Sequence, residues 1–402
     1  MNQISINNKI TLAVLFFFAF GFLLYTSEAI QSILMGITGL IMLFYYKSWK
    51  DLLTHYTLPF LICFVCLLSI NLFYFHPKSI QIITNSLLIF IIPLFSFYLY
   101  QSPWFLNKKT IIMGTYCISI LLLTLYVIGF YILDYPNHHF NWYFARFNLE
   151  NNMHIHGTYL SLWIGVAFLM AVNYFLTKEH RKTVKYSLLT ALLIYLLGLL
   201  IVNSRTTISS ILFLTCFRFY FHYYKKNKTL FIVSILILVA ASLFISQRYQ
   251  DDLNYFYQNN ITNSTRYTLC YCSIETAADS NFLGTDNGLI QSKLNTCYTK
   301  YGFTNFSKEN LNSHNQYLDF LLKGGFLLFV SFIWMIYNKL RYTSKTENYL
   351  YFTITLLFVF AFCTENILVR QYGIYVYLFC DILLLGSILP NKSHCTDKIK
   401  EC

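Results

Sequence analysis

Long apolar stretches, separated by short polar connections, repeat along almost the whole chain. The stretches contain about 17 to 23 residues, and a helix of that length can cross the hydrocarbon core of a bilayer. The pattern predicts an all-α polytopic membrane protein with about twelve transmembrane helices, at residues 10–26, 29–46, 57–75, 80–100, 111–133, 157–176, 186–202, 206–222, 229–246, 316–338, 348–363 and 372–389.

One connection is much longer than the others and separates the predicted ninth and tenth spans. It divides the chain into four regions, which are spans 1 to 9 in residues 1–246, the loop at 247–315, spans 10 to 12 in residues 316–389, and a tail at 390–402. Long loops within a compact architecture are usually functional. We therefore expect the chemistry of this protein on the side of the membrane that carries this loop.

Composition and charge agree with a membrane location. The chain is 56% hydrophobic and only 11% charged, whereas about 25% of an ordinary soluble domain is charged. With a cytoplasmic amino terminus, most of the 29 Lys and Arg residues, Lys339 among them, fall in cytoplasmic connections, as the positive-inside rule requires. The formal charge of +12 then reflects topology, and we expect no nucleic-acid partner. The long loop lies outside and is close to neutral, so anion recognition there depends on individual arginines.

A histidine and two asparagines stand directly before the predicted tenth span, in NSHNQYLDFLLKGG at residues 312–325. Ser313 followed by Gln316 fits a capping box, which predicts Ser313 as the helix cap and His314 as the first helical residue. The imidazole would then share a helix face with Tyr317, and the helix amino terminus would keep it neutral. A neutral imidazole can act as a general base. The alternative is a capping histidine that bonds to water at the interface.

Two arginines on the outer side are candidates for binding an anion. Arg205 lies between two spans with almost no loop, and no acidic residue is near it in sequence. A guanidinium group suits a phosphate or pyrophosphate, since it offers a planar fork of donors; a snorkelling side chain that anchors the helix end is the alternative. Arg266, in NSTRYTLCY, follows in the long loop, where an ordinary surface arginine is the simpler interpretation.

Other polar residues lie near the outer ends of predicted spans. Glu365 and Arg370, in TENILVRQYG, are expected to form a local salt bridge, although Glu365 could instead hold an imidazole in one tautomer. His154 and His156 precede the sixth span in NNMHIHGTYLSLW. Histidines at this spacing pair poorly as metal ligands, so His156 is a candidate for substrate contact or for docking of the chain.

Cysteines and acidic residues limit the other kinds of chemistry. Cys270, Cys272 and Cys297 lie in the outer loop, an oxidising location where one disulfide to Cys297 could form. No carboxylate set suits a metal and no glycine loop suits ATP, so we expect chemistry without a metal or other cofactor.

Several of these segments, in this order, resemble the O-antigen ligase family, which includes O-antigen polymerases and some protein O-oligosaccharyltransferases. SHNQYLDFLLKGGFLL is similar to the family's histidine-asparagine signature, and NSRTTIS and STRYTLCYCSI resemble its arginine segments. FLGTDNG is similar to its glycine-rich segment but departs from it at GTDNG. HIHGTYLSLW and TENILVRQYG resemble stretches of many bacterial members. The resemblance runs from about residue 140 to about residue 375.

The resemblance implies a membrane glycosyltransferase of the bacterial inner membrane whose active site faces the periplasm. The donor would be a glycan on undecaprenyl or another polyprenyl pyrophosphate, and the acceptor would be lipid A-core, as in lipopolysaccharide biosynthesis. By the same resemblance, His314 would deprotonate or orient the acceptor hydroxyl, and Arg205 and Arg266 would bind the pyrophosphate. Asn315 would support the histidine. The substrate site would be lined by Tyr317, His156, Glu365 and Arg370. Membrane lipids would surround the spans.

Two alternatives remain from the sequence. A polymerase of the same family would transfer the glycan to another repeat unit on the same carrier. A polysaccharide or solute transporter also fits twelve spans, but the halves show no symmetry and no matched pair of broken helices. The unusual polar residues gather on one face and do not line a path through the bilayer, which favours the enzyme.

Overall fold

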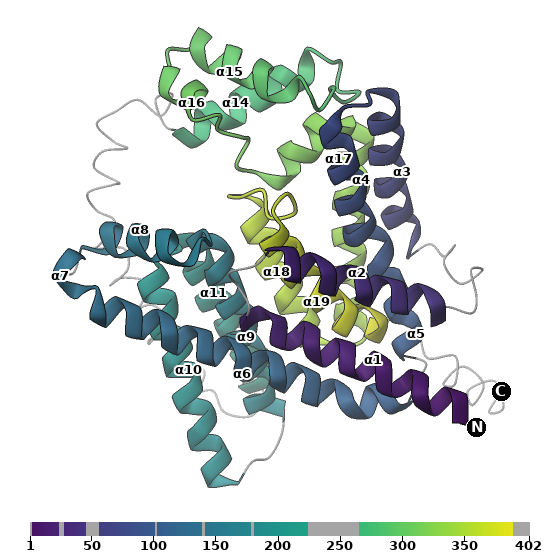
Figure 1. Cartoon of the computed structure of the whole chain (residues 1–402), viewed down its shortest axis with the longest axis vertical. Coiled ribbons are helices and arrows are strands. Elements are labelled where there is room, and N and C mark those ends of the chain that lie inside the picture. Colours follow the sequence, from purple (N-terminus) through teal and green to yellow (C-terminus); the bar gives the residue numbers. More distant parts are fainter. Residues whose placement is uncertain are drawn as a thin grey trace.

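The computed structural model is helical throughout the part of the chain that it describes, residues 2–23, 28–45, 56–100, 103–138, 141–177, 181–223 and 265–388 (Figure 1). The predicted ninth span at 229–246, the first part of the predicted loop at 247–264 and the tail at 390–402 lie outside the described residues. The predicted fold class is confirmed at the level of an all-helical architecture in the described residues, with helices long and apolar enough to span a membrane. The number of twelve spans and their topology stay predictions.

The amino-terminal half contains the helices α1 (Asn2–Phe20), α2 (Glu28–Tyr45), α3 (Leu58–Phe73), α4 (Pro77–Ser86), α5 (Ser96–Tyr100), α6 (Pro103–Leu133), α7 (Tyr135–His138), α8 (Trp142–Met153), α9 (Gly157–Thr177), α10 (Lys182–Val202) and α11 (Arg205–Tyr223). Between α4 and α5 the helix continues as a π-helical turn at Leu87–Ile91 and a 3-10 turn at Ile92–Phe95. The connection at 134–156 therefore carries α7 and α8.

The carboxy-terminal half contains α14 (Thr265–Ala278), α15 (Ile290–Lys300), α16 (Thr304–Lys308), α17 (Gln316–Lys345), α18 (Tyr349–Phe362) and α19 (Gln371–Leu384). The described part of the long loop thus contains three helices, joined by turns and irregular segments.

Five of the helical stretches in the described residues are long and apolar enough to cross a membrane, namely Pro77–Phe95, Trp104–Leu133, Gly157–Thr177, Lys182–Val202 and Gln316–Lys345. Shorter apolar helices include Leu58–Phe73, Tyr349–Phe362 and Gln371–Ser387. Most predicted spans coincide with a helix, because a continuous apolar run leaves the backbone no polar partner outside its own helix.

The core of the bundle is rich in aromatic side chains. Phe22, from the turn after α1, packs edge-to-face on Tyr116 of α6 and Trp163 of α9, with ring centroids 4.7 and 4.9 Å apart. The Trp163 indole N–H donates to the Tyr372 carbonyl at 3.0 Å, and the Tyr116 hydroxyl donates to the Trp163 carbonyl at 2.9 Å. These bonds satisfy the polar ends of large buried rings and join α6, α9 and α19.

Helices α14, α15 and α16 lie together at one end of the molecule, beyond the ends of α3, α4 and α17 (Figure 1). Cys272 of α14 and Cys297 of α15 form a disulfide, so the disulfide to Cys297 that we considered from the sequence is present. Cys270 is free and exposed. Leu269, Leu294 and Tyr298 form a small separate core that also contacts the start of α17. This helical cap is therefore fixed by its own core and by a covalent bond.

A break in α17 receives the glycine-containing segment of the long loop. Gly325 has φ 69° and ψ −168°, a conformation that is essentially restricted to glycine. The Phe326 N–H donates to the Phe282 carbonyl at 2.7 Å, and the Thr285 N–H donates to the Leu322 carbonyl at 2.8 Å. A Cβ at Gly325 would lie 2.5 Å from the Phe282 oxygen. Glycine at 325 thus permits backbone to pack on backbone, which ties the cap to α17.

The placement of Lys339 in a connection is wrong, because α17 continues to Lys345 and buries it; its cytoplasmic side stays a prediction. Its ammonium group lies 2.5 Å from Oδ2 of Asp381, donates to the Tyr377 hydroxyl at 2.6 Å, and is 1% exposed. The Tyr351 hydroxyl donates to the other carboxylate oxygen at 2.7 Å. The sequence interpretation missed this pair because Lys339 and Asp381 come from different helices and meet only in the bundle.

Candidate functional site

The turn before α17 holds His314 in a strained backbone conformation. His314 has φ 43°, in the left-handed region that side chains other than glycine seldom adopt. The Asn312 side-chain oxygen accepts its N–H at 2.9 Å and supports the turn. Strain of this kind often occurs at functional sites, and here it turns the histidine away from the helix that follows.

The predicted capping arrangement is wrong by two residues. Helix α17 begins at Gln316, and its cap is Asn315, whose side-chain oxygen accepts the N–H groups of Tyr317 and Leu318 at 3.0 and 3.1 Å. Serine and asparagine are both good caps, so the sequence offered two starts and the later one is used. His314 therefore lies outside the helix, and the argument that the helix amino terminus keeps it neutral no longer applies.

Ser313 and Asn315 attach this turn to the connection between α18 and α19. The Ser313 hydroxyl donates to the Asn366 side-chain oxygen at 3.2 Å, and the Asn315 amide donates to the Cys363 carbonyl at 3.1 Å. Two segments far apart in the sequence are thereby fixed against each other on both sides of His314. Asn315 supports the histidine in this indirect way.

The imidazole of His314 faces the carboxylate of Glu365. Nδ1 lies 3.0 Å from Oε2, with the two side chains 27% and 16% exposed. Burial raises the pKa of Glu365, but the hydrogen bond to His314 and the positive charges of His314 and Arg266 outweigh it and hold the pKa below its usual value. The alternative role of Glu365, holding an imidazole, agrees with this geometry. The expected Glu365–Arg370 salt bridge is wrong, since the ion pairs of Glu365 within the described residues are with His314 and Arg266.

Arg266, at the start of α14, contacts both the turn of His314 and the segment of Glu365. Its guanidinium donates to the Thr364 carbonyl at 2.7 Å and to the His314 carbonyl at 3.4 Å, and lies 3.7 Å from Oε1 of Glu365. The side chain is still 56% exposed. The structure thus brings together His314, Glu365 and Arg266 from three separate segments, with part of the guanidinium open to a ligand.

His156 lies close enough to this cluster for the charges of Glu365 and His314 to affect its pKa. Desolvation lowers the pKa of His156, while the negative charges of Glu150 and Glu365 raise it and the positive charges of Arg146 and His314 lower it. Glu150 pairs with Arg146 at 2.7 Å and also accepts the Gly157 N–H at 2.7 Å. The Arg146–Glu150 pair was missed from the sequence, although its i, i+4 spacing on a helix is a recognisable signal.

Arg205 begins α11, and its side chain is exposed. The preceding turn, with Asn203 at φ 56°, ends α10. Val202 lies against Gly157, where a Cβ would be 3.2 Å from its methyl group. Arg205 therefore starts its helix near the segment that carries His156. Convergence of Arg205 with the imidazole of His314 stays a prediction.

Tyr317 and Arg370 lie on other sides of the cluster. The Tyr317 ring packs on Phe332 and Phe362, and its hydroxyl donates to the Val359 carbonyl at 3.4 Å. This placement gives Tyr317 a packing role, and its contact with substrate stays a prediction. Arg370 is exposed and lines a cavity beside the cluster.

The cluster has the parts of a general base. With a proton on Nδ1, His314 donates to Glu365 and presents the lone pair of Nε2 to a substrate hydroxyl. The carboxylate fixes the tautomer and stabilises the imidazolium that forms on proton transfer. Arg266 places positive charge beside it, where an anion that develops in the reaction would be stabilised.

Comparison with protein families matches residues 190–333 to O-antigen ligase. The match confirms the resemblance found in the sequence. It includes Arg205, Arg266 and His314, whereas His156 and Glu365 lie outside it. A comparison with curated proteins found no match.

Proposed function

We propose that this chain, which matches the O-antigen ligase family over residues 190–333, transfers a glycan from a polyprenyl-pyrophosphate carrier to an acceptor hydroxyl at the periplasmic face of the bacterial inner membrane. The observation that carries the proposal is the cluster of His314, Glu365 and Arg266 within hydrogen-bonding or ion-pairing reach. The acceptor in this proposal is the core sugar of lipid A.

The reaction is a direct displacement at the anomeric carbon. Nε2 of His314 accepts the proton of the acceptor hydroxyl while the hydroxyl oxygen forms a bond to that carbon. The bond from the anomeric carbon to the phosphate oxygen breaks, and the polyprenyl pyrophosphate leaves with the bonding electrons. Arg266 and Arg205 stabilise the charge of the leaving group, an electrostatic contribution that is usually large in enzymes.

Arg266 has a structural role in addition to its role in the reaction. Its bonds to the Thr364 and His314 carbonyls hold the turn of His314 and the loop of Glu365 together. The exposed part of the guanidinium is then available to the pyrophosphate. Arg266 therefore positions the base and also supplies positive charge at the leaving group.

A gene deletion tests the proposed acceptor. Loss of a ligase leaves unmodified lipid A-core together with polymer that stays on its carrier, and the expected result is this pair of products. Loss of a polymerase instead leaves lipid A-core capped with a single repeat unit, which would move the assignment to the alternative within the same family. Unchanged lipopolysaccharide would contradict both.

A further inference from the structure

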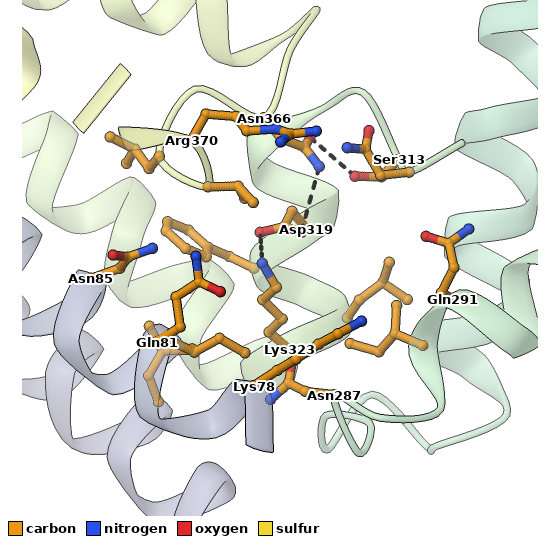
Figure 2. A pocket seen from close by; sticks show the side chains of 18 of the residues that line it. Lys78, Gln81, Asn85, Asn287, Gln291, Ser313, Asp319, Lys323, Asn366 and Arg370 are labelled. Atoms are coloured by element: carbon orange, nitrogen blue, oxygen red, sulfur yellow. Dashed lines mark hydrogen bonds and ion pairs between the residues drawn. The ribbon is translucent and has the colours of Figure 1, made fainter. Parts of the chain in front are cut away.

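A cavity of about 400 Å³ lies beside the His314 cluster (Figure 2). It is bounded by α4, by α15, by the first turns of α17, and by the connection between α18 and α19. Ser313 and Asn366 line it, whereas their neighbours His314 and Glu365 do not. The turn before α17 thus has the cavity on one side and the imidazole on the other. The volume is within the usual range for ligand pockets.

Carboxamide side chains from several elements surround this cavity. Gln81 and Asn85 come from α4, Gln291 from α15, and Asn366 from the connection after α18 (Figure 2). A carboxamide has both a donor and an acceptor. Gln291 already donates to Asn295 and Leu311, and Asn366 is bonded to Ser313 and Asp319, so Gln81 and Asn85 supply the polar groups for a ligand. Apolar side chains such as Leu67 complete the walls. Such a lining suits a ligand with many hydroxyl groups and some exposed C–H surface, which describes a sugar ring.

A further carboxamide at the cavity wall, that of Asn287, has a polar atom without a hydrogen-bond partner. The Asn287 amide donates to the Asn71 side-chain oxygen at 2.9 Å. Its own oxygen is buried and has no hydrogen-bond partner, and the residue is only 9% exposed. Leaving a buried acceptor unpaired is unfavourable. The Asn287–Asn71 bond fixes the segment before α15 against α3 at the wall of the cavity.

The charges around the cavity favour an anion. Lys78, Lys323 and Arg370 line it together with one carboxylate, Asp319. Lys323 pairs with Asp319 at 2.7 Å. Lys78 and Arg370 form no ion pair with a carboxylate of the described residues, so two positive charges remain for the ligand.

We propose that this cavity binds an anionic sugar residue, meaning a sugar ring that carries a carboxylate or a phosphate. The carboxamides of Gln81 and Asn85 bond its hydroxyl groups, and Lys78 and Arg370 bind its charge. That the sugar belongs to the glycan substrate rests on the proposed function, because only the transfer reaction requires a saccharide next to His314. Binding of an anionic sugar by the cavity does not depend on it.

Equilibrium binding to the purified full-length protein tests this proposal, with glucuronate, glucose 6-phosphate, glucose and inorganic phosphate as probes. We expect glucuronate or glucose 6-phosphate to bind at least about tenfold more tightly than glucose, since a charge-assisted hydrogen bond exceeds a neutral one. The better of the two distinguishes a carboxylate ligand from a phosphate ligand. Inorganic phosphate should bind more weakly than glucose 6-phosphate, because it lacks the hydroxyl groups.

Three variants locate the binding. Lys78→Gln removes an exposed charge on α4 and should weaken binding of the preferred anionic sugar roughly tenfold. Lys308→Gln makes the same change on exposed α16, outside the cavity, and should leave binding unchanged. His314→Ala should also leave binding unchanged while it abolishes transfer, so binding and catalysis are measured separately.

Each result decides one of the two proposals. Equal affinity for glucose and its charged counterparts, equal binding of inorganic phosphate and glucose 6-phosphate, or equal effects of Lys78→Gln and Lys308→Gln would overturn the anionic sugar site. Lys78-dependent binding in a protein that transfers no glycan would keep the site and overturn the proposed function.

Discussion

Nδ1 of His314 lies 3.0 Å from Oε2 of Glu365, across 51 residues of sequence. The contact joins the turn before α17 to the connection after α18, and Arg266 bonds to both segments. The imidazole is therefore fixed in position and has a carboxylate on one ring nitrogen. Its other ring nitrogen, Nε2, is the atom that we propose as the general base.

Replacing Glu365 with Gln should lower the rate of transfer without removing the protein from the membrane. The amide keeps the shape of the carboxylate but cannot stabilise the imidazolium, and we expect a loss on the order of 10²-fold in kcat, within the range of general acid–base contributions. Initial rates of glycan transfer by purified protein provide the measurement. Glu309→Gln, at an exposed carboxylate of the long loop before α17, is the matched control and should be near wild type.

The same carboxylate should make stability depend on pH. Because folding lowers the pKa of Glu365 from 4.5, its contribution to stability is present above pH about 4.5 and is lost as pH falls through the folded-state pKa. Between pH 7 and pH 3, the unfolding temperature should therefore decrease less steeply for Glu365→Gln than for wild type. Parallel curves for the two proteins would count against the ion pair.

Arg205→Lys should be severely impaired in transfer. Lysine keeps the charge but not the planar fork that binds a pyrophosphate in two places, and we expect at least a tenfold loss of kcat/KM. Arg181→Lys, the same exchange at the exposed residue before α10, serves as control. If Arg205→Lys were as active as Arg181→Lys, the pyrophosphate role of Arg205 would have to be abandoned.

Sequence patterns were sufficient for most of the long apolar helices, because these depend on local composition. They did not predict the helices α8, α14, α15 and α16 in the polar connections. They were not sufficient to predict which side chains pair with each other. Glu365 and His314 meet only after α17 and α18 pack, and the buried Lys339–Asp381 pair has the same origin. The cap of α17 was misplaced because SHNQ contains two residues that cap equally well.

The disulfide between Cys272 and Cys297 should stabilise the helical cap. It closes a loop across a sequence separation of 25 residues, and a loop of this size corresponds to about 2–4 kcal/mol. We expect Cys272→Ser to lower the unfolding temperature of the purified protein, and reduction of wild type to have a similar effect. Cys270→Ser, at the free exposed cysteine of the same helix, should change nothing; an equal effect at both positions would argue against the disulfide.

Gly325→Ala should disrupt the packing of the long loop on α17. The added Cβ would lie 2.5 Å from the Phe282 oxygen, so the backbone contact must open in addition to the cost of a positive φ. Gly302→Ala separates these effects, since Gly302 also has a positive φ of 83° but no neighbour within 4 Å of its Cβ position. Limited proteolysis should cleave the 279–289 segment faster in Gly325→Ala than in Gly302→Ala. Equal protection would show that the close approach is unimportant.

The most direct test of the central claim is glycan transfer by purified protein carrying a substitution of His314. His314→Ala removes the base, and His314→Asn removes it with a residue that tolerates the left-handed backbone. His154→Ala is the control, at another histidine with a positive φ. With a polyprenyl-pyrophosphate-linked glycan and lipid A-core supplied, we predict that wild type and His154→Ala form the product. Both His314 variants should be inactive although they fold, and product formation at the wild-type rate by either one would contradict the proposed mechanism.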